Sequence, residues 1–400
     1  MEFNDIELDN NNIVDQLIDT NPFDYDINQY FYDNNLFFNS IKYAFLNQYN
    51  KSEFYKNLVN LKYKKQFSKE FNIEIFINNI EKLDDFFNWY LFLSVWVLKE
   101  YANTDYFILN KDYQVELYSS GTRGRKSRIV LDELTLNRIK KIVFNIYKAY
   151  NLVDLENEYN YLFFTYEIDF ASNIGTAFSD ILLTSLAPKI KNKFFALKYD
   201  SNKKDFYFDI EGVIYTLRKY SKDELPIRIL GFPAYIYFTI NEIKKRNLKF
   251  NFDGVVLPGG GWKTLDNQEI PKPIFRKLIK DYLGIREENI RDLYGLVEHG
   301  IPYVECEYFN MHIPNYSRIL IFNPLTKTFY KDVNQIGLIS FITPYCNSYA
   351  SNFVISSDVG YLGSNCKCNR RSLYINLLGR AGKTKLRGCA INALQYIQQK

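Results

Sequence analysis

The chain has 400 residues, of which 47% are hydrophobic and 24% are charged. These proportions are typical of a globular protein and exclude wholesale disorder or a fibrous architecture. The formal net charge is only +4 against 50 basic and 46 acidic residues, so no overall field favours nucleic acid or an anionic membrane as a partner.

The N-terminal residues are acidic and precede no long apolar stretch, so they do not resemble a signal peptide. The longest apolar run, residues 86–98, is interrupted by Asn88 and is shorter than the about 20 residues that a membrane span needs. We expect this run to form a buried helix and expect no membrane span. The five cysteines, an odd number in a chain of this length, favour a reducing, cytoplasmic location with free thiols.

The first third of the chain is predicted to be mainly helical. Residues 1–35 are rich in Asn and Asp, and residues 37–101 carry apolar side chains at helical spacing. From Tyr113 the pattern changes to short apolar runs typical of strands, which alternate with helical stretches. The expected strands cover residues 115–118, 161–166, 194–197, 227–229 and 254–257.

One helical stretch between these strands is amphipathic. Its apolar residues recur every three or four positions and therefore share one helix face. They are Leu136, Ile139, Val143, Ile146, Tyr147 and Tyr150. Strands that alternate with helices predict an α/β fold.

Beyond Gly300 the sequence becomes rich in β-type runs. A turn is expected at Asn323-Pro324-Leu325-Thr326, between the apolar residues 319–322 and 328–330. We therefore divide the chain into a mostly helical N-terminal region (1–110), an α/β core (111–378) and a short C-terminal hairpin or tail (379–400).

A loop rich in serine and glycine follows the strand expected at residues 115–118. It reads Ser119-Ser120-Gly121-Thr122-Arg123-Gly124-Arg125-Lys126-Ser127. Small residues let backbone N–H groups approach a polyphosphate, hydroxyl groups add donors, and the cations balance the phosphate charge. The spacing differs from the Walker pattern. On composition alone, the loop fits a phosphate site and a polar turn equally well.

Five further motifs follow this loop along the chain. They are Gly231-Phe232-Pro233, Gly259-Gly260-Gly261, Tyr294-Gly295-Leu296-Val297-Glu298, Asp358-Val359-Gly360, and Gly379-Arg380 ahead of Lys385-Leu386-Arg387-Gly388. Together with the loop, they resemble the pattern of the adenylate-forming superfamily, which includes acyl-CoA synthetases, luciferases and phenylacetate-CoA ligases. The resemblance implies the α/β large N-terminal domain of that superfamily, with mixed sheets flanked by helices and a β-rich subdomain.

Within the superfamily, the chain is similar to the bacterial acyl-protein synthetases of the bioluminescence fatty-acid reductase system. That branch shares Lys126-Ser127 at the end of the loop and the string Gly259-Gly260-Gly261-Trp262-Lys263. Its chains also stop soon after the Arg-Gly motif, where typical acyl-CoA synthetases continue into a mobile lid domain. The resemblance therefore implies that the C-terminal lid domain is truncated.

The resemblance also implies roles for individual residues. The loop is expected to hold the β- and γ-phosphates of ATP through Ser119, Ser120, Gly121, Thr122, Gly124, Lys126 and Ser127. The loop departs from the superfamily pattern at Arg123, where threonine is usual.

The adenine is expected to lie between Tyr294-Gly295 and the strand edge Gly259-Gly260-Gly261, with the ribose hydroxyls on Asp358 and Arg380. Glu298 is expected to ligate Mg²⁺, because a carboxylate that attacks the α-phosphorus meets a polyanion whose charge must be neutralised. Taken singly, Asp358 also fits a turn residue and Glu298 an exposed helix carboxylate.

Two residues near the chemistry are expected to replace the missing lid and to accept the acyl group. Without the lid lysine, Lys263 is a candidate to steady charge at the α-phosphate, and a surface lysine is an equally good reading. Cys389 matches by position the C-terminal cysteine that accepts the acyl group in acyl-protein synthetases. Lys385 and Arg387 would lower the pKa of its thiol, whereas a buried structural cysteine is the alternative.

The pair Cys366-Lys367-Cys368 raises the question of a metal site. No second cysteine pair lies nearby, and His299 and His312 are far off in sequence, so a four-ligand zinc site is incomplete. We interpret the pair as a turn. His299 adjoins Glu298 and could line an acyl pocket, but a hydrogen-bonded structural histidine is the preferred reading.

The leading functional hypothesis is an enzyme that uses ATP and Mg²⁺ to adenylate a carboxylic acid, with a fatty acid favoured by analogy. It would then acylate Cys389 and present the thioester to a partner reductase, acyltransferase or carrier protein. One alternative is an acyl-CoA ligase of the phenylacetate-CoA ligase type. The other is a non-catalytic, adenylate-binding scaffold subunit.

Overall fold

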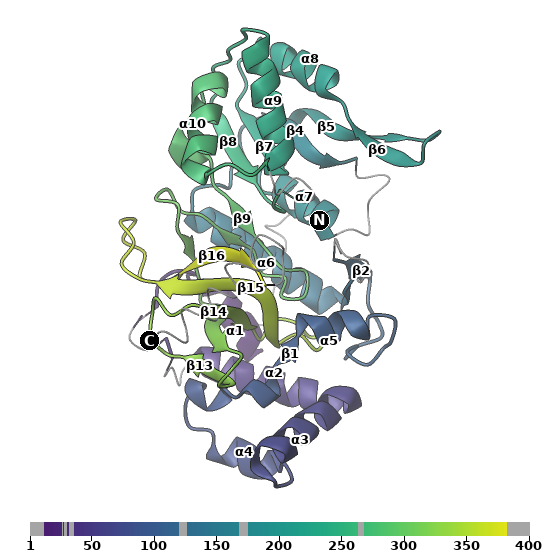
Figure 1. Cartoon of the computed structure of the whole chain (residues 1–400), viewed down its shortest axis with the longest axis vertical. Coiled ribbons are helices and arrows are strands. Elements are labelled where there is room, and N and C mark those ends of the chain that lie inside the picture. The colour runs from purple at the N-terminus through teal and green to yellow at the C-terminus, as the bar shows by residue number, and fades with distance from the viewer. Residues whose placement is uncertain are drawn as a thin grey trace.

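The computed structural model describes residues 12–25, 27, 30–31, 36–119, 126–167, 175–262 and 268–381. Two β-sheets with their flanking helices make up most of this part of the chain (Figure 1). None of its helices is both long enough and apolar enough to cross a membrane.

The helical structure expected over residues 37–101 is present as several separate helices. They are α2 (Leu36–Lys51), α3 (Glu53–Phe67), α4 (Ile73–Asn79) and α5 (Val95–Glu100), and a further helix, α1 (Ile13–Ile18), precedes them. Helices α1, α3, α4 and α5 each start after a side-chain cap, which satisfies a free N–H group of the first turn. The Ser52 side chain accepts from Tyr55 N at the start of α3, and Ser94 does the same for Val97 N in α5.

The single buried helix expected over residues 86–98 is wrong. The run instead forms parts of the 3₁₀ turns η3 (Leu83–Phe86) and η4 (Trp89–Leu91), the short strand β1 (Leu93–Ser94), and α5. The Asn88 side chain donates to Asp85 O, a local bond that competes with helix continuation. Tyr90, Leu91 and Phe92 are all buried. Because consecutive residues are all apolar, the sequence shows no periodicity that would mark where one element ends and the next begins.

A five-stranded sheet forms the upper part of the molecule in Figure 1. Its strands are β4 (Tyr159–Tyr166), β5 (Ile190–Asp200), β6 (Asp205–Phe208), β7 (Ile227–Gly231) and β8 (Gly254–Pro258). The spatial order is β6-β5-β4-β7-β8, parallel except for the β5–β6 pair. Helix α8 (Ile210–Tyr220) packs against β5, α9 (Pro233–Lys245) packs against β4, and α10 (Lys272–Leu283) packs against α9.

The second sheet is built mainly from the C-terminal part of the chain, which confirms the β-rich pattern expected beyond Gly300. Its strands are β11 (Met311–His312), β12 (Arg318–Asn323), β13 (Thr328–Tyr330), β14 (Gly337–Ile342), β15 (Phe353–Gly363) and β16 (Tyr374–Arg380). They lie in the order β11-β16-β15-β14-β12-β13, and β1 adds to β15. The turn expected at residues 323–326 joins β12 to β13, and the Asn323 side chain accepts from Leu325 N.

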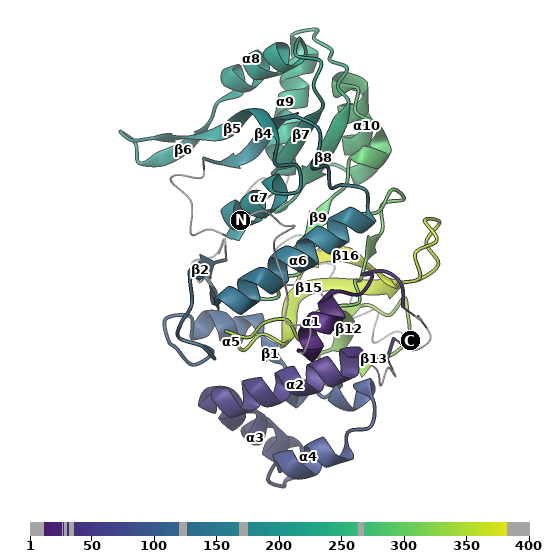
Figure 2. The ribbon, with the colours of Figure 1, turned by 180° about the vertical axis from the view of Figure 1, so that it is seen from behind.

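Several further elements complete the described part of the chain. The hairpin β2 (Val115–Tyr118) and β3 (Arg128–Leu131) precedes α6 (Glu133–Ala149), the amphipathic helix expected from the sequence. Helix α7 (Gly175–Thr184) follows β4, and the pair β9 (Leu293–Tyr294) and β10 (Tyr303–Val304) follows the turn η7 (Glu287–Asn289). From behind, α1 lies against both α2 and α6 (Figure 2).

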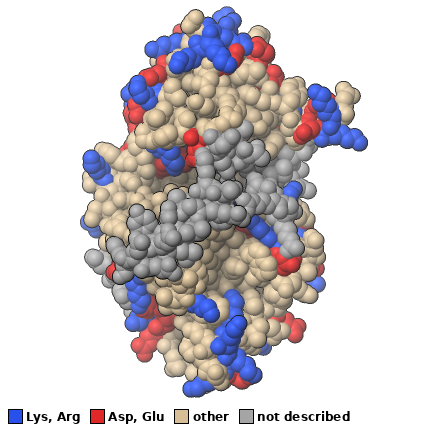
Figure 3. All heavy atoms as spheres, viewed as in Figure 1, with Lys and Arg blue, Asp and Glu red and all other residues tan. Residues whose placement is uncertain are grey.

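Two hydrophobic cores hold these elements together. One contains residues of the five-stranded sheet and of α8, α9 and α10. The other joins the N-terminal helices to α6 and to the C-terminal sheet. Basic and acidic side chains both lie at the top and at the bottom of the face drawn in Figure 3.

Candidate active site

The predicted phosphate loop connects the two strands of the β2–β3 hairpin. Tyr118 pairs with Arg128 at the end of the ladder. Ser119 N donates to Ser127 O at 3.0 Å, and Ser127 N donates to the Ser119 hydroxyl at 2.8 Å. These bonds close the base of the loop, and Lys126 is exposed beside it. The remaining predicted loop residues, Ser120, Gly121, Thr122 and Gly124, lie outside the described part.

Glu298 lies beside the end of this loop, although 171 residues separate it from Ser127. The Ser127 hydroxyl donates to Glu298 Oε1, and both residues are buried. Glu298 belongs to a turn in which His299 N and Gly300 N both donate to Leu296 O. Gly300 has φ +81°, and a Cβ there would lie 1.8 Å from the Tyr345 hydroxyl, so the turn requires glycine. The alternative that Glu298 is an exposed carboxylate on a helix is therefore wrong, because Glu298 is buried and lies in a turn.

Asp358 brings two of the predicted nucleotide residues together. Its Oδ2 accepts from the Tyr294 hydroxyl at 2.7 Å, and its Oδ1 accepts from Arg380 Nε at 3.0 Å. Asp358 and Arg380 are directly opposite in the β15–β16 ladder. The Asp358 side chain is 7% exposed and that of Arg380 is 47% exposed. One carboxylate thus connects the end of the C-terminal sheet to Tyr294 in β9.

The glycines predicted to flank adenine continue the carboxyl end of β8. Gly259 forms a parallel bridge with Leu293, the neighbour of Tyr294, and its N–H donates to Gly231 O. A Cβ built on Gly261 or on Gly295 would meet nothing within 4 Å, so both glycines face open space. The carboxyl ends of parallel strands in open α/β sheets are the usual place for ligands.

Burial sets the protonation of the ring side chains nearby. It raises the pKa of Tyr294 well above its usual value, and the charge of Asp358 acts in the same direction. Tyr294 is therefore a neutral hydrogen-bond donor. Burial lowers the pKa of His299 to about 3. His299 Nε2 lies 2.8 Å from the Tyr303 hydroxyl, and its ring stacks on Phe341, as a neutral structural histidine would.

The structure thus assembles two groups of the predicted residues, one at Ser127 and Glu298 and the other at Asp358. The remaining predictions for Lys263 and Cys389 fall on residues outside the described part of the chain.

The interpretation of Cys366 and Cys368 as a simple turn needs correction. The fold places Cys306 and His312 next to them, so that four ligand-type atoms lie within 4.8 Å of one another. His312 is 54 positions before Cys366 by numbering, and Cys306 stands alone in sequence, so spacing gave no zinc pattern. The signal was the number of cysteines in the C-terminal hundred residues, which we assigned to free thiols.

Comparisons with known proteins bear on the family and on the fold of the chain. A family model described as "Acyl-protein synthetase, LuxE" matches residues 1–397. A long-chain-fatty-acid–luciferin-component ligase of Aliivibrio fischeri is 25% identical over 285 residues, which cover 70% of this chain and 72% of that protein. A protein of the same name from Vibrio harveyi is 22% identical over 296 residues, with the same coverage of 70% and 72%.

Among solved structures, the chain resembles an open conformation of 2-hydroxyisobutyryl-CoA ligase in complex with 2-HIB-AMP and CoA. The TM-score is 0.63 at 11% sequence identity, over 88% of this chain and 70% of that chain. This likeness is one of fold, and it confirms the α/β architecture of mixed sheets flanked by helices.

Proposed function

We propose that this chain, which belongs to the LuxE family of acyl-protein synthetases, activates a fatty acid with ATP and transfers the acyl group to its own Cys389. The names of the two bacterial relatives, both ligases of long-chain fatty acids, support this class of acid. The thioester would then supply a partner reductase, acyltransferase or carrier protein.

The observation that carries the first step is the contact between Ser127 and Glu298. A buried carboxylate is costly unless it is paired or binds a metal ion. Glu298 is 2% exposed, and among the residues that the structure describes it has no ion-pair partner; its hydrogen bond there comes from a neutral hydroxyl. This environment fits a divalent cation at the end of a phosphate loop. Glu298 would hold Mg²⁺, which neutralises triphosphate charge when it is bound.

The arrangement around Asp358 supports a nucleotide beside the same segment of the chain, because Tyr294 and Glu298 both belong to residues 294–298. An ionised carboxylate offers about four acceptor positions, and Tyr294 and Arg380 use one on each oxygen. The positions left over suit the two ribose hydroxyls. The adenine would lie along the Gly259 edge, where Gly261 and Gly295 leave open space.

The chemistry then follows in two balanced steps. A carboxylate oxygen of the acid attacks the α-phosphorus of ATP, the bond to the bridging oxygen breaks, and pyrophosphate leaves with the electron pair. The thiolate of Cys389 next attacks the acyl carbon, the bond to the phosphate oxygen breaks, and AMP leaves. We assign Lys263 to the charge that develops at the α-phosphate in the first step.

Acid-dependent ATP–pyrophosphate exchange tests the activation step. We expect exchange with fatty acids, and we expect Glu298→Gln to reduce it by about tenfold or more, because the variant loses a metal ligand that acts in the transition state. Glu242→Gln, near the end of α9, controls for the loss of a carboxylate. Exchange with no acid from acetate to palmitate would sink the proposal, and normal exchange in Glu298→Gln would make that residue structural.

Intact mass after incubation with ATP, Mg²⁺ and acid tests the transfer step. Wild type should gain one hydroxylamine-labile acyl group. Cys389→Ala should lose this adduct but keep exchange, whereas Cys346→Ala, which changes a buried cysteine, should keep both. An adduct that persists in Cys389→Ala identifies another nucleophile, and consumption of coenzyme A without an adduct identifies an acyl-CoA ligase.

A further inference from the structure

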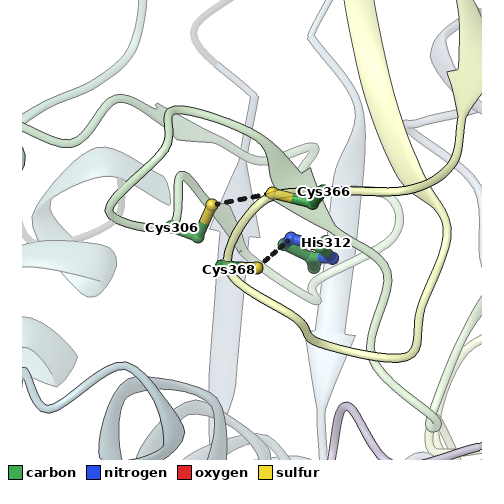
Figure 4. A group of neighbouring side chains, drawn as sticks. All are labelled: Cys306, His312, Cys366 and Cys368. Atoms are coloured by element: carbon green, nitrogen blue, oxygen red, sulfur yellow. Dashed lines mark hydrogen bonds between the residues drawn. The ribbon is translucent and has the colours of Figure 1, made fainter.

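A cluster of three cysteines and one histidine lies outside the set of residues assigned to catalysis. It consists of Cys306, His312, Cys366 and Cys368, whose side chains point toward one another (Figure 4). Their ligand-type atoms all lie within 4.8 Å of one another. Two separate segments, residues 306–312 and 366–368, supply them, so the convergence is a product of the fold.

The first segment is a tight turn that ends in a strand. Cys306 N donates to Asn310 O, and Phe309 N donates to Cys306 O, both at 2.9 Å. Phe309 takes the left-handed conformation, with φ +64°, which reverses the chain. His312 follows in β11 and pairs with Tyr374 of β16.

The second segment lies in the connection from β15 to β16. Asn369 N donates to Cys366 O at 3.2 Å, and Asn365 and Asn369 both have φ +63°. Asparagine tolerates this region better than most residues. The turn places the sulfur atoms of Cys366 and Cys368 on the side that faces the first segment (Figure 4).

We propose that these four side chains bind one Zn²⁺ ion in a closed, structural site. Zinc takes four nitrogen or sulfur ligands in a tetrahedron, and a Zn–S bond of about 2.3 Å puts neighbouring sulfur atoms about 3.8 Å apart. The sulfur atoms of Cys306 and Cys366 are 3.6 Å apart, and Cys368 Sγ lies 3.1 Å from His312 Nε2. These two distances are within about half an ångström of those in a tetrahedral site, and no pair of ligand atoms in the cluster is more than 4.8 Å apart.

The surroundings of His312 orient it as a metal ligand. Its Nδ1 lies 2.8 Å from the Ser372 hydroxyl, which leaves Nε2 for the cluster. Metal-bound histidines usually have such a partner on the second ring nitrogen, since it fixes the orientation of the ring.

The sulfur atoms have donors that suit thiolates. The side-chain amide of Asn310 donates to Cys366 Sγ at 3.1 Å, and Tyr308 N donates to Cys306 Sγ at 3.4 Å. Three thiolates and Zn²⁺ carry a net charge of −1, and Arg370 supplies an adjacent positive charge.

Other readings explain less of the geometry. A disulfide between Cys306 and Cys366 would not explain why Cys368 Sγ lies close to His312 Nε2. A cluster with several iron atoms holds its ligands farther apart than one ion does. A catalytic zinc keeps one coordination position open, whereas here protein side chains supply all four.

The ion would tie together the strands that carry the nucleotide residues. The Cys306 turn follows β10, which pairs with β9 through Tyr303 and Tyr294. Cys366 and Cys368 join β15 to β16, the two strands of Asp358 and Arg380. Zinc binding would therefore fix one end of both strand pairs.

Metal analysis of the full-length protein tests the site. After purification in reducing buffer without chelator, we expect one zinc per chain by elemental mass spectrometry. Cys366→Ala and His312→Ala should lose it, whereas Cys346→Ala, which changes a buried cysteine outside the cluster, should keep it. His312→Cys should also keep it, because four cysteines bind zinc equally well. Ser372→Ala should weaken zinc binding by about 10- to 100-fold.

Replacement of the metal in wild type covers the case in which the alanine variants do not fold. Co²⁺ should give the visible absorption of a tetrahedral, thiolate-rich site, and zinc should abolish it. Zinc no higher than the buffer blank together with no Co²⁺ absorption overturns the proposal. Equal zinc loss in Cys346→Ala and Cys366→Ala, or an intact Cys306–Cys366 disulfide in the reduced preparation, does the same.

Discussion

Asp358→Asn separates a role in nucleotide binding from a role in holding the strands. Each oxygen of Asp358 accepts one bond from the protein, from Tyr294 or from Arg380. The amide of asparagine keeps one acceptor oxygen but replaces the other by a donor. The variant therefore loses the negative charge and at least one acceptor position proposed for the ribose.

The size of the effect follows from the strength of hydrogen bonds to charged groups, about 1.5–3 kcal/mol each. Loss of one such bond to the ribose should weaken ATP binding by about 10- to 100-fold, since about 1.4 kcal/mol corresponds to tenfold. The effect on folding should be smaller. Arg380 is half-exposed, and an ion pair of this kind contributes about 0–1 kcal/mol.

The assay is the KM for ATP in pyrophosphate exchange at saturating acid, measured with the midpoint of thermal unfolding. Tyr294→Phe is the matched control, because it removes the bond to Asp358 and keeps the ring. We expect Tyr294→Phe to change the KM by less than Asp358→Asn. An unchanged KM in a folded Asp358→Asn protein would refute the ribose assignment, and equal losses in the two variants would mean that Asp358 acts by positioning Tyr294.

Two further predictions concern stability. Burial raises the pKa of Asp180 to about 7 from its ordinary value of 3.8, so the folded protein binds this proton more tightly than the unfolded chain. The stability that this proton contributes is present in full below pH 3.8 and is lost as the pH rises through 7. Asp180→Asn should therefore stabilise the protein against urea at pH 8 and much less at pH 4; an equal gain at both would contradict the shift. Gly231 has φ +122°, and a Cβ there would lie 2.6 Å from the Phe164 carbonyl, so Gly231→Ala should cost about 1–3 kcal/mol for the backbone strain alone. Gly261 also has a positive φ, +67°, but a Cβ there meets open space. Gly261→Ala should therefore lower the unfolding midpoint less, because it adds no steric clash to the backbone strain; the reverse order would refute the steric argument.

The elements that the sequence predicted well are those with a local cause. The strand expected at residues 115–118 is β2 (Val115–Tyr118), and the helix with Ile139 and Val143 on one face is α6. Each was marked by periodicity and by a clear break, such as the serine-rich loop after Tyr118. The order of the motifs likewise identified the residues that meet at Asp358.

The features that were missed depend on contacts between distant segments. The sequence placed Glu298 on a helix surface as one possibility, because the pairing with Ser127 over 171 residues has no local signature. Cys306 and His312 join Cys366 and Cys368 only after β11 pairs with β16. The spacing of residues along the sequence cannot show that distant side chains, whether carboxylates or thiols, come together in the fold.

The pairing of β1 with β15 has a consequence for biosynthesis. Leu93 of β1 lies opposite Val354 of β15. The ribosome therefore makes β15, the partner of β1, about 260 residues after it has made β1. At about 5–20 residues per second, this delay is on the order of 13–50 s. During that time the apolar faces of the N-terminal helices lack the sheet they cover in the native state. We therefore expect the nascent chain to depend on chaperones until its last strands have emerged.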